Sequence, residues 1–167
     1  MLDTSVLLHD PDSIYSFDGS EVIICTQVLL EVDKKRSSSG QVGKNARLVI
    51  ENLKNMLQKR SSEIIEDKKS ISLKLKNNSI LYLYLNSDSF LSSSGHFLNL
   101  NNIEKYMTDL NIIKLTEMEN ATLVTNDFTM QIIAWMKGIN VEDYRSDNPE
   151  RTLFYNGTTD VTVVNSV

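Results

Sequence analysis

Four acidic residues of this sequence lie where polar side chains gather in an open α/β sheet. Asp3 ends the first short apolar segment, and Asp127 directly follows another apolar run. Glu31 lies one to two turns into a predicted helix, and Asp109 opens a second one. Because ligands of such a sheet bind beyond the carboxyl ends of its strands, we expect the four carboxylates to converge on one edge of the sheet.

Converging carboxylates repel one another unless a cation lies among them. The chain has two His and one Cys, too few for a zinc site built on nitrogen and sulfur ligands. Hard oxygen ligands instead select Mg²⁺ or Mn²⁺. An ion of this kind suits hydrolysis of phosphodiester bonds, because it lowers the pKa of an attacking water and offsets the charge of the phosphate.

Each acid also has a purely structural explanation. The two strand-end aspartates suit helix N-caps, which are common after strands. Glu31 suits the solvated face of a helix, and Glu104 and Glu117 are alternatives to Asp109 as the third acid.

Strands that alternate with helices position these acids. This order predicts a three-layer α/β/α fold with a mostly parallel central sheet, joined by a β-hairpin at about 71–85. Strands are expected at 21–25, 121–125 and 139–144, helices at 26–36, 42–57, 108–119 and 128–136, and a loop at 86–102. Thr26 is expected to cap its helix, and Trp135, at helical spacing with Ile132, is expected in the core.

The size and composition of the chain fit one domain. It has 167 residues, 41% of them hydrophobic and 23% charged, and a net charge of −5 that alone argues against a nucleic-acid partner. No apolar stretch approaches the ~18 residues of a membrane-spanning helix, and no signal peptide is visible. The single Cys25, in an apolar run, suits a buried small side chain in a reducing compartment, so we expect a cytoplasmic protein with no membrane partner.

A second group of residues could contact phosphate. Contacts of this kind orient RNA without reading its sequence, although an ordinary solvated helix face explains the same residues equally well. The group consists of Lys34, Lys35, Arg36, Lys44, Asn45 and Arg47. Tyr82 and Tyr84 alternate on a predicted strand and could stack on bases, but packing against the sheet is the favoured interpretation.

The string Leu2-Asp3-Thr4-Ser5-Val6-Leu7-Leu8-His9-Asp10-Pro11 resembles the opening motif of PIN-domain nucleases. More narrowly, it is similar to the PIN domain at the front of PhoH-type ATPases. Further matching segments lie at 28–34, 43–47, 109–113, 123–127 and 141–144, so the resemblance covers about residues 1–145. Residues 146–167 look like a linker or hairpin tail that starts a second domain.

The resemblance implies hydrolysis of single-stranded RNA with Mg²⁺ or Mn²⁺. The four acidic positions of the family fall on Asp3, Glu31, Asp109 and Asp127, and the positions that orient the acids fall on Ser5 and Thr125. It also implies RNA as a partner, a PhoH-like ATPase domain in a longer chain, and a possible homo-oligomer.

Two departures from the family pattern leave other functions open. Only two residues precede Asp3, so the first strand is expected to be short, and Leu110 replaces the usual Asn beside the third acid. Both departures favour a catalytically weak RNA-binding or assembly module as the alternative, while a toxin nuclease held by a small inhibitor is a weaker third reading. The Gly43-Lys44 pair lacks the other residues of a phosphate-binding loop, so no nucleotide site is expected there.

Overall fold

A computed structural model describes residues 1–59, 65–66, 70–85 and 100–144 of the chain. The predicted tail at 146–167 and most of the predicted loop at 86–102 lie outside these residues. The described elements are α1 (Thr4–His9), a 3₁₀ turn (Ser13–Tyr15), β1 (Glu21–Cys25), α2 (Thr26–Lys35), α3 (Gly40–Lys59), β2 (Ile65–Glu66), β3 (Ser70–Lys74), β4 (Ile80–Tyr84), α4 (Leu100–Met118), β5 (Leu123–Val124), α5 (Phe128–Met136) and β6 (Val141–Glu142).

The strands form two groups, in the orders β1-β4-β3-β2 and β5-β6. β1 pairs with β4 in parallel and β5 with β6 in parallel, whereas β3 pairs with β4 and with β2 antiparallel. The predicted hairpin at 71–85 is therefore present as β3 and β4, and its second strand also extends the parallel part of the sheet. The protein is an α/β fold with a mixed sheet, as predicted.

Residues 1–3 join the two groups of strands. Leu2 donates its N–H to the carbonyl of Ile23 in β1 over 2.9 Å and forms a parallel bridge with Val124 in β5. On the β5 side, Val124 donates to the Met1 carbonyl over 2.9 Å, and Asp3 donates to the Val124 carbonyl over 3.1 Å. This three-residue segment therefore acts as a central strand and delivers Asp3 to the carboxyl edge of the sheet.

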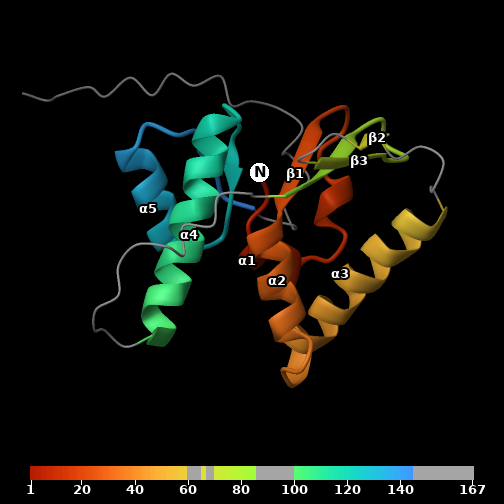
Figure 1. Ribbon diagram of the computed structural model, residues 1–167, viewed down its shortest axis with the longest axis horizontal. Helices are drawn as coiled ribbons and strands as arrows, with labels where there is room; N and C mark the ends of the chain where they lie inside the picture. The colour runs from red at the N-terminus through yellow and green to blue at the C-terminus, as the bar shows by residue number, and fades with distance from the viewer. Residues whose placement is uncertain (60–64, 67–69, 86–99, 145–167) are drawn as a thin grey trace, which may run out of the picture.

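The core lies between the strands and the helices that flank them. α4 and α5 lie beside β5 and β6, while α1, α2 and α3 lie beside β1 and the hairpin (Figure 1). Fully buried side chains come from both groups: Val28 and Val32 from α2, Ile112 and Ile113 from α4, and Ile24, Leu81 and Leu123 from the strands. Cys25 is also fully buried, and burial raises the pKa of its thiol. None of the described helices is long and apolar enough to cross a membrane.

Three local predictions are wrong. α4 begins at Leu100 rather than near residue 108, because the Asn-rich start of the helix has the composition of a loop. Thr26 is the first residue of α2 and not its cap, since its hydroxyl donates to the Tyr84 carbonyl over 3.1 Å. Trp135 and Ile132 are 55% and 39% exposed, because α5 buries its opposite face through Met130 and Ala134.

Candidate metal centre

Asp3 is a buried carboxylate that ends the central segment and caps α1. Its Oδ2 accepts three hydrogen bonds: from the Ser5 hydroxyl at 2.6 Å, from the Thr125 hydroxyl at 2.8 Å and from the Ser5 N–H at 3.3 Å. Its Oδ1 accepts no hydrogen bond from the described residues. The carboxylate of Asp3 is only 5% exposed, and the hydrogen bonds to Oδ2 offset part of its loss of hydration. The lone pairs of Oδ1 remain available to a ligand.

Ser5 and Thr125 tie Asp3 to the segment that precedes α5. The Ser5 hydroxyl accepts the N–H of Asn126 at 3.0 Å, and the Thr125 hydroxyl accepts the N–H of Asp127 at 3.0 Å. Because each hydroxyl has a single proton, donated to Asp3, both groups are fixed as donors to the carboxylate and acceptors from the backbone. Two strand ends that are 122 residues apart in the chain are thereby held in one network.

Asp127 is the N-cap of α5. Its Oδ1 accepts the N–H groups of Thr129 at 2.9 Å and Met130 at 3.3 Å. The structural explanation, a helix cap, thus holds for this acid, and its backbone N–H is linked to Asp3 through the Thr125 hydroxyl.

Glu31 reaches the same region from α2. Its Oε2 accepts the hydroxyl of the buried Thr4 at 2.6 Å, and Thr4 directly follows Asp3 in the chain. The other carboxylate oxygen of Glu31 accepts no hydrogen bond from the described residues. As in Asp3, one oxygen is fixed by the protein and the second remains for another ligand.

The remaining acid, Asp109, is carried by α4. It is partly buried on α4, and α4 packs against α2, the helix that carries Glu31. Across residues 1–59, 65–66, 70–85 and 100–144, no three His, Cys, Asp or Glu side chains lie close enough together to form a metal site. Asp3, Asp127 and Glu31 are thus linked through hydroxyl groups, and the four acids are not gathered into one ligand set.

Two orphaned oxygen atoms belong to residues adjacent to these acids. The side-chain oxygens of Gln27 and Asn126 are buried and have no hydrogen-bond partner among the residues that the structure describes. Gln27 lies one turn before Glu31 on α2, and Asn126 lies directly before Asp127. An unpaired buried carbonyl oxygen costs about 1–3 kcal/mol, so each calls for a donor or a cation. Carboxylate and amide oxygens together are the donors that Mg²⁺ and Mn²⁺ prefer, so the donor chemistry fits such an ion.

Gln131 and Asp143 lie at the same edge of the sheet, and neither was predicted from the sequence as a site residue. The buried Gln131 amide donates to the Thr125 carbonyl at 2.9 Å and to Asp143 Oδ1 at 3.4 Å. Asp143 directly follows β6, as Asp127 follows the β5 segment, and this position after a strand was the available signal. Gln131 had none, because an amide on an apolar helix is not distinctive.

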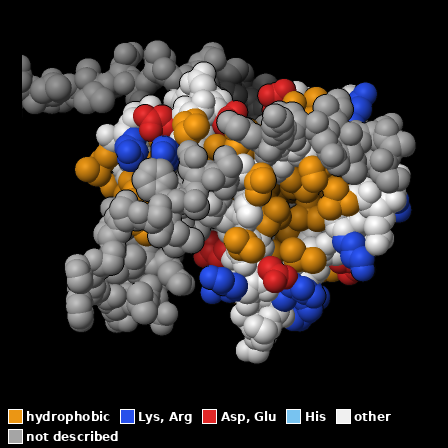
Figure 2. Space-filling view, viewed as in Figure 1, with side chains coloured by type: hydrophobic (Ala, Val, Ile, Leu, Met, Phe, Trp, Pro, Cys, Tyr) orange, Lys and Arg blue, Asp and Glu red, His pale blue; other side chains and the backbone are white. Residues whose placement is uncertain are grey.

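Most of the proposed phosphate-binding residues lie on the surface. The exposed members are Lys34, Lys35, Arg36, Lys44 and Arg47. Arg36 forms an ion pair with Asp33 at 2.8 Å, and the Arg47 guanidinium donates to the Arg36 carbonyl at 2.6 Å, so the end of α2 and the start of α3 lie together. On the face shown in Figure 2, basic side chains lie beside acidic ones over these two helices.

Asn45 does not belong to this surface. It is 4% exposed, and its amide donates to the carbonyls of Leu8 at 2.7 Å and His9 at 3.2 Å at the end of α1. These carbonyls have no partner within their own helix, so Asn45 satisfies them and is not available to RNA. Gly43, two residues earlier, also lies within α3, where a Cβ atom would come 1.8 Å from the Ser38 carbonyl oxygen. Glycine here serves close packing.

Comparison with known proteins agrees with the motifs. Residues 1–145 match the PIN domain family. The chain is 33% identical over 153 residues to Protein PhoH2 of Bacillus subtilis (strain 168); the match covers 88% of this chain and 33% of PhoH2, so the chain spans about a third of that relative. A solved domain of a functionally unknown protein from Methanocaldococcus jannaschii DSM 2661 is 18% identical, with a TM-score of 0.49 over 99% of this chain and 96% of that one. The chain belongs to the PIN domain family, whose members are typically metal-dependent nucleases.

Proposed function

We propose that this chain is a divalent-metal-dependent ribonuclease that hydrolyses phosphodiester bonds of single-stranded RNA. Asp3, Glu31, Asp109 and Asp127 hold Mg²⁺ or Mn²⁺, and Ser5 and Thr125 position the acids. The observation that carries the proposal is the state of Asp3, a buried carboxylate with three donors on one oxygen and none from the described residues on the other.

The residues present have distinct parts in this reaction. A bound divalent ion lowers the pKa of a water and offsets the negative charge of the phosphate. Asp3 and Glu31 each keep one oxygen fixed by a hydroxyl, which orients the second oxygen without a change of rotamer. Lys34, Lys35, Arg36, Lys44 and Arg47 contact the RNA backbone and bring the scissile phosphate to the acids.

A catalytically weak RNA-binding or assembly module is the second candidate. The observation that favours it is that no three acidic side chains of the described residues form a ready ligand set. In both cases we propose that the PIN domain works beside a PhoH-like ATPase domain of a longer chain, and the 33% identity to Protein PhoH2 supports this. Self-association of the domain is also proposed, and sedimentation of the purified chain tests it.

Cleavage of a labelled single-stranded RNA with Mn²⁺ or Mg²⁺, with and without chelator, separates the two candidates. If the chain is a ribonuclease, the wild type should cleave the RNA and the chelator should stop cleavage. Asp3→Asn and Asp127→Asn should each abolish it. Glu51→Gln is the matched control, because Glu51 is an exposed acid on α3 remote in sequence from the four. Cleavage that survives both Asp substitutions would exclude this site, and RNA binding without divalent cation and without turnover would favour the module.

A further inference from the structure

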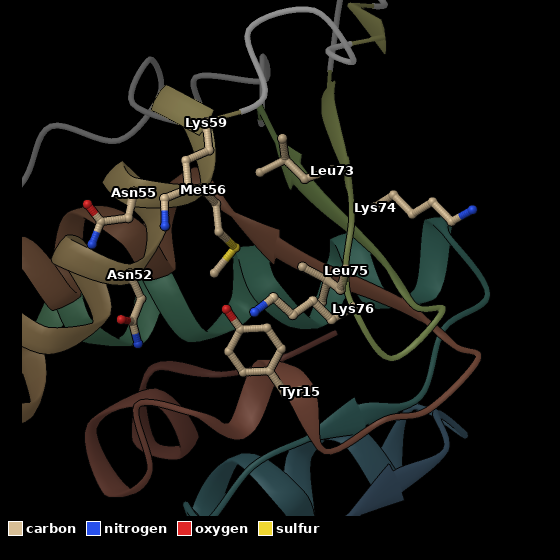
Figure 3. Close-up of a pocket in the computed structure, with 9 residues that line it drawn as sticks. All are labelled: Tyr15, Asn52, Asn55, Met56, Lys59, Leu73, Lys74, Leu75 and Lys76. Atoms are coloured by element: carbon tan, nitrogen blue, oxygen red, sulfur yellow. The ribbon is translucent and has the colours of Figure 1, made fainter.

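A pocket of about 260 Å³ lies on another part of the molecule. It is formed by the second half of α3, the end of β3 with the residues that follow it, and the 3₁₀ turn. The lining residues are Tyr15, Asn52, Asn55, Met56, Lys59, Leu73, Lys74, Leu75 and Lys76 (Figure 3). None of them belongs to the acidic edge or to the basic residues proposed to contact RNA.

The pocket lies toward the opposite edge of the sheet from the acids. Leu75 and Lys76 enter the turn before β4, whose first residue Ile80 pairs with Glu21, the first residue of β1. Asp3 and Asp127 instead lie at the carboxyl ends of the parallel segments that pair through Leu2 and Val124. Since β1 has five residues and rises about 3.3 Å for each step, the two edges are about 13 Å apart. The pocket is therefore a separate site.

The lining combines an apolar floor with positive charge. Leu73 and Leu75 are buried, and Met56 is half-buried against the core. Figure 3 shows Lys76 extending toward Tyr15 and Lys59 extending beside Met56, while Lys74 points away. Tyr15 is 37% exposed.

The positive charge of the pocket is not neutralised by the described residues. Neither Lys59 nor Lys76 forms an ion pair with a carboxylate within that part of the chain. The acid attached to the lining is Asp12, which accepts a hydrogen bond from Asn52 at 3.3 Å. The segment 60–69 that separates α3 from β3 contains three basic and three acidic residues, so it adds no net charge.

We propose that this pocket binds one nucleotide, with its phosphate on Lys59 and Lys76 and its base against Tyr15 and the apolar floor. An exposed aromatic ring beside unpaired cations is the combination that binds single-stranded nucleic acid without sequence preference. The volume of about 260 Å³ lies just below the ~300–1,000 Å³ of pockets for drug-sized ligands, so it limits the occupant to one nucleotide at most. The nucleotide is either free or part of RNA; the second source rests on the proposed ribonuclease.

Binding measurements without divalent cation test the pocket independently of cleavage. The full chain in EDTA is titrated with a labelled single-stranded oligonucleotide and, separately, with adenosine monophosphate at several salt concentrations. The variant Lys59→Ala/Lys76→Ala removes the two charges, and Lys54→Ala/Lys137→Ala, two exposed lysines outside the pocket, is the matched control. Thermal unfolding checks that all variants fold.

The two pocket changes have different signatures. Loss of the single phosphate contact that both lysines make lowers the slope of log affinity against log salt by about 0.7 for a single strand. Tyr15→Leu keeps an apolar side chain and weakens binding about fivefold to a hundredfold with an unchanged salt slope. Effects on both ligands identify a site for free nucleotides, and effects on the oligonucleotide alone identify a site for RNA.

Unchanged binding of both ligands by the pocket variants would overturn the proposal. That result is distinguishable from failure of the proposed function. If metal-dependent cleavage is lost in Asp3→Asn and the pocket variants bind normally, the chain is a ribonuclease and the pocket is not a nucleotide site. If the wild type does not cleave RNA and the pocket variants bind more weakly, the pocket is a nucleotide site on a non-catalytic module.

Discussion

The Thr4 hydroxyl donates a hydrogen bond to Oε2 of Glu31 over 2.6 Å, although 27 residues separate them in the chain. Thr4 is the neighbour of Asp3, so this contact holds a carboxylate of α2 beside the start of α1. The residue itself does not act on the substrate in the proposed reaction. Its contribution is the orientation of Glu31.

Thr4→Val tests this positioning role, because valine has the same shape and no hydroxyl. We expect metal affinity or RNA cleavage to fall about 10- to 100-fold, the usual effect of losing a group that orients a metal ligand. The measurement is the Mn²⁺ dependence of cleavage. Thr4→Ser should restore most of the activity; a serine variant as impaired as the valine one would show that packing, and not the hydroxyl, matters.

Thr125→Val removes the hydroxyl between Asp3 and Asp127. The N–H of Asp127 then loses its acceptor and Asp3 loses one of its donors, so the free energy of unfolding should fall by about 1–3 kcal/mol. Urea unfolding gives this value, with Thr129→Val on the exposed surface of α5 as control. A stability equal to that of the wild type would mean that the network contributes nothing to the fold.

Asn45→Ala should lower stability without weakening RNA binding by the folded protein. The two carbonyls at the end of α1 lose their donor, which costs about 1–3 kcal/mol. Lys44→Ala provides the opposite expectation, because Lys44 is exposed: unchanged stability and weaker binding at low salt. Denaturant unfolding and RNA titration of both variants decide, and the reverse pattern would restore Asn45 to the RNA-binding surface.

Cys25 should be unreactive in the folded protein, because it is fully buried and burial raises the pKa of its thiol. Labelling by a thiol reagent at pH 8 is expected only as fast as the chain unfolds, and immediately in denaturant. The folded state retains the thiol proton above about pH 8.5, where the unfolded chain releases it. The associated stability is present below that pH and is lost as pH rises toward the folded value. Cys25→Ala should show less of this loss, and fast labelling without denaturant would contradict the prediction.

Elements with one clear hydrophobic pattern could be predicted from the sequence. The strand at Glu21–Cys25 is a continuous apolar run, and the hairpin has alternating side chains around a turn of Asn and Ser. α5 carries apolar residues on nearly all sides, so periodicity did not reveal that Met130 faces inward while Phe128 is 65% exposed.

Side chains that bind distant backbone groups could not be predicted. Asn45 and Gln131 donate to carbonyls at the end of α1 and after β5, and nothing in their local sequence indicates those partners. Asp3 and Asp127 could be predicted as site residues, because a carboxylate that directly follows a strand is recognisable from its position in the sequence. Their shared contact through Thr125 depends on three-dimensional packing alone.

The central segment of residues 1–3 joins the two groups of strands over a short length. Asp3 belongs to this segment and Asp127 follows the β5 side, so a local opening between residues 2 and 124 would separate the two acids without unfolding the β1–β4 half. Amide hydrogen exchange at Val124 and Asp3 therefore reports directly on the integrity of the sheet edge that carries Asp3 and Asp127. A ligand that bridges Asp3 and Asp127 would hold these two segments together and slow that exchange.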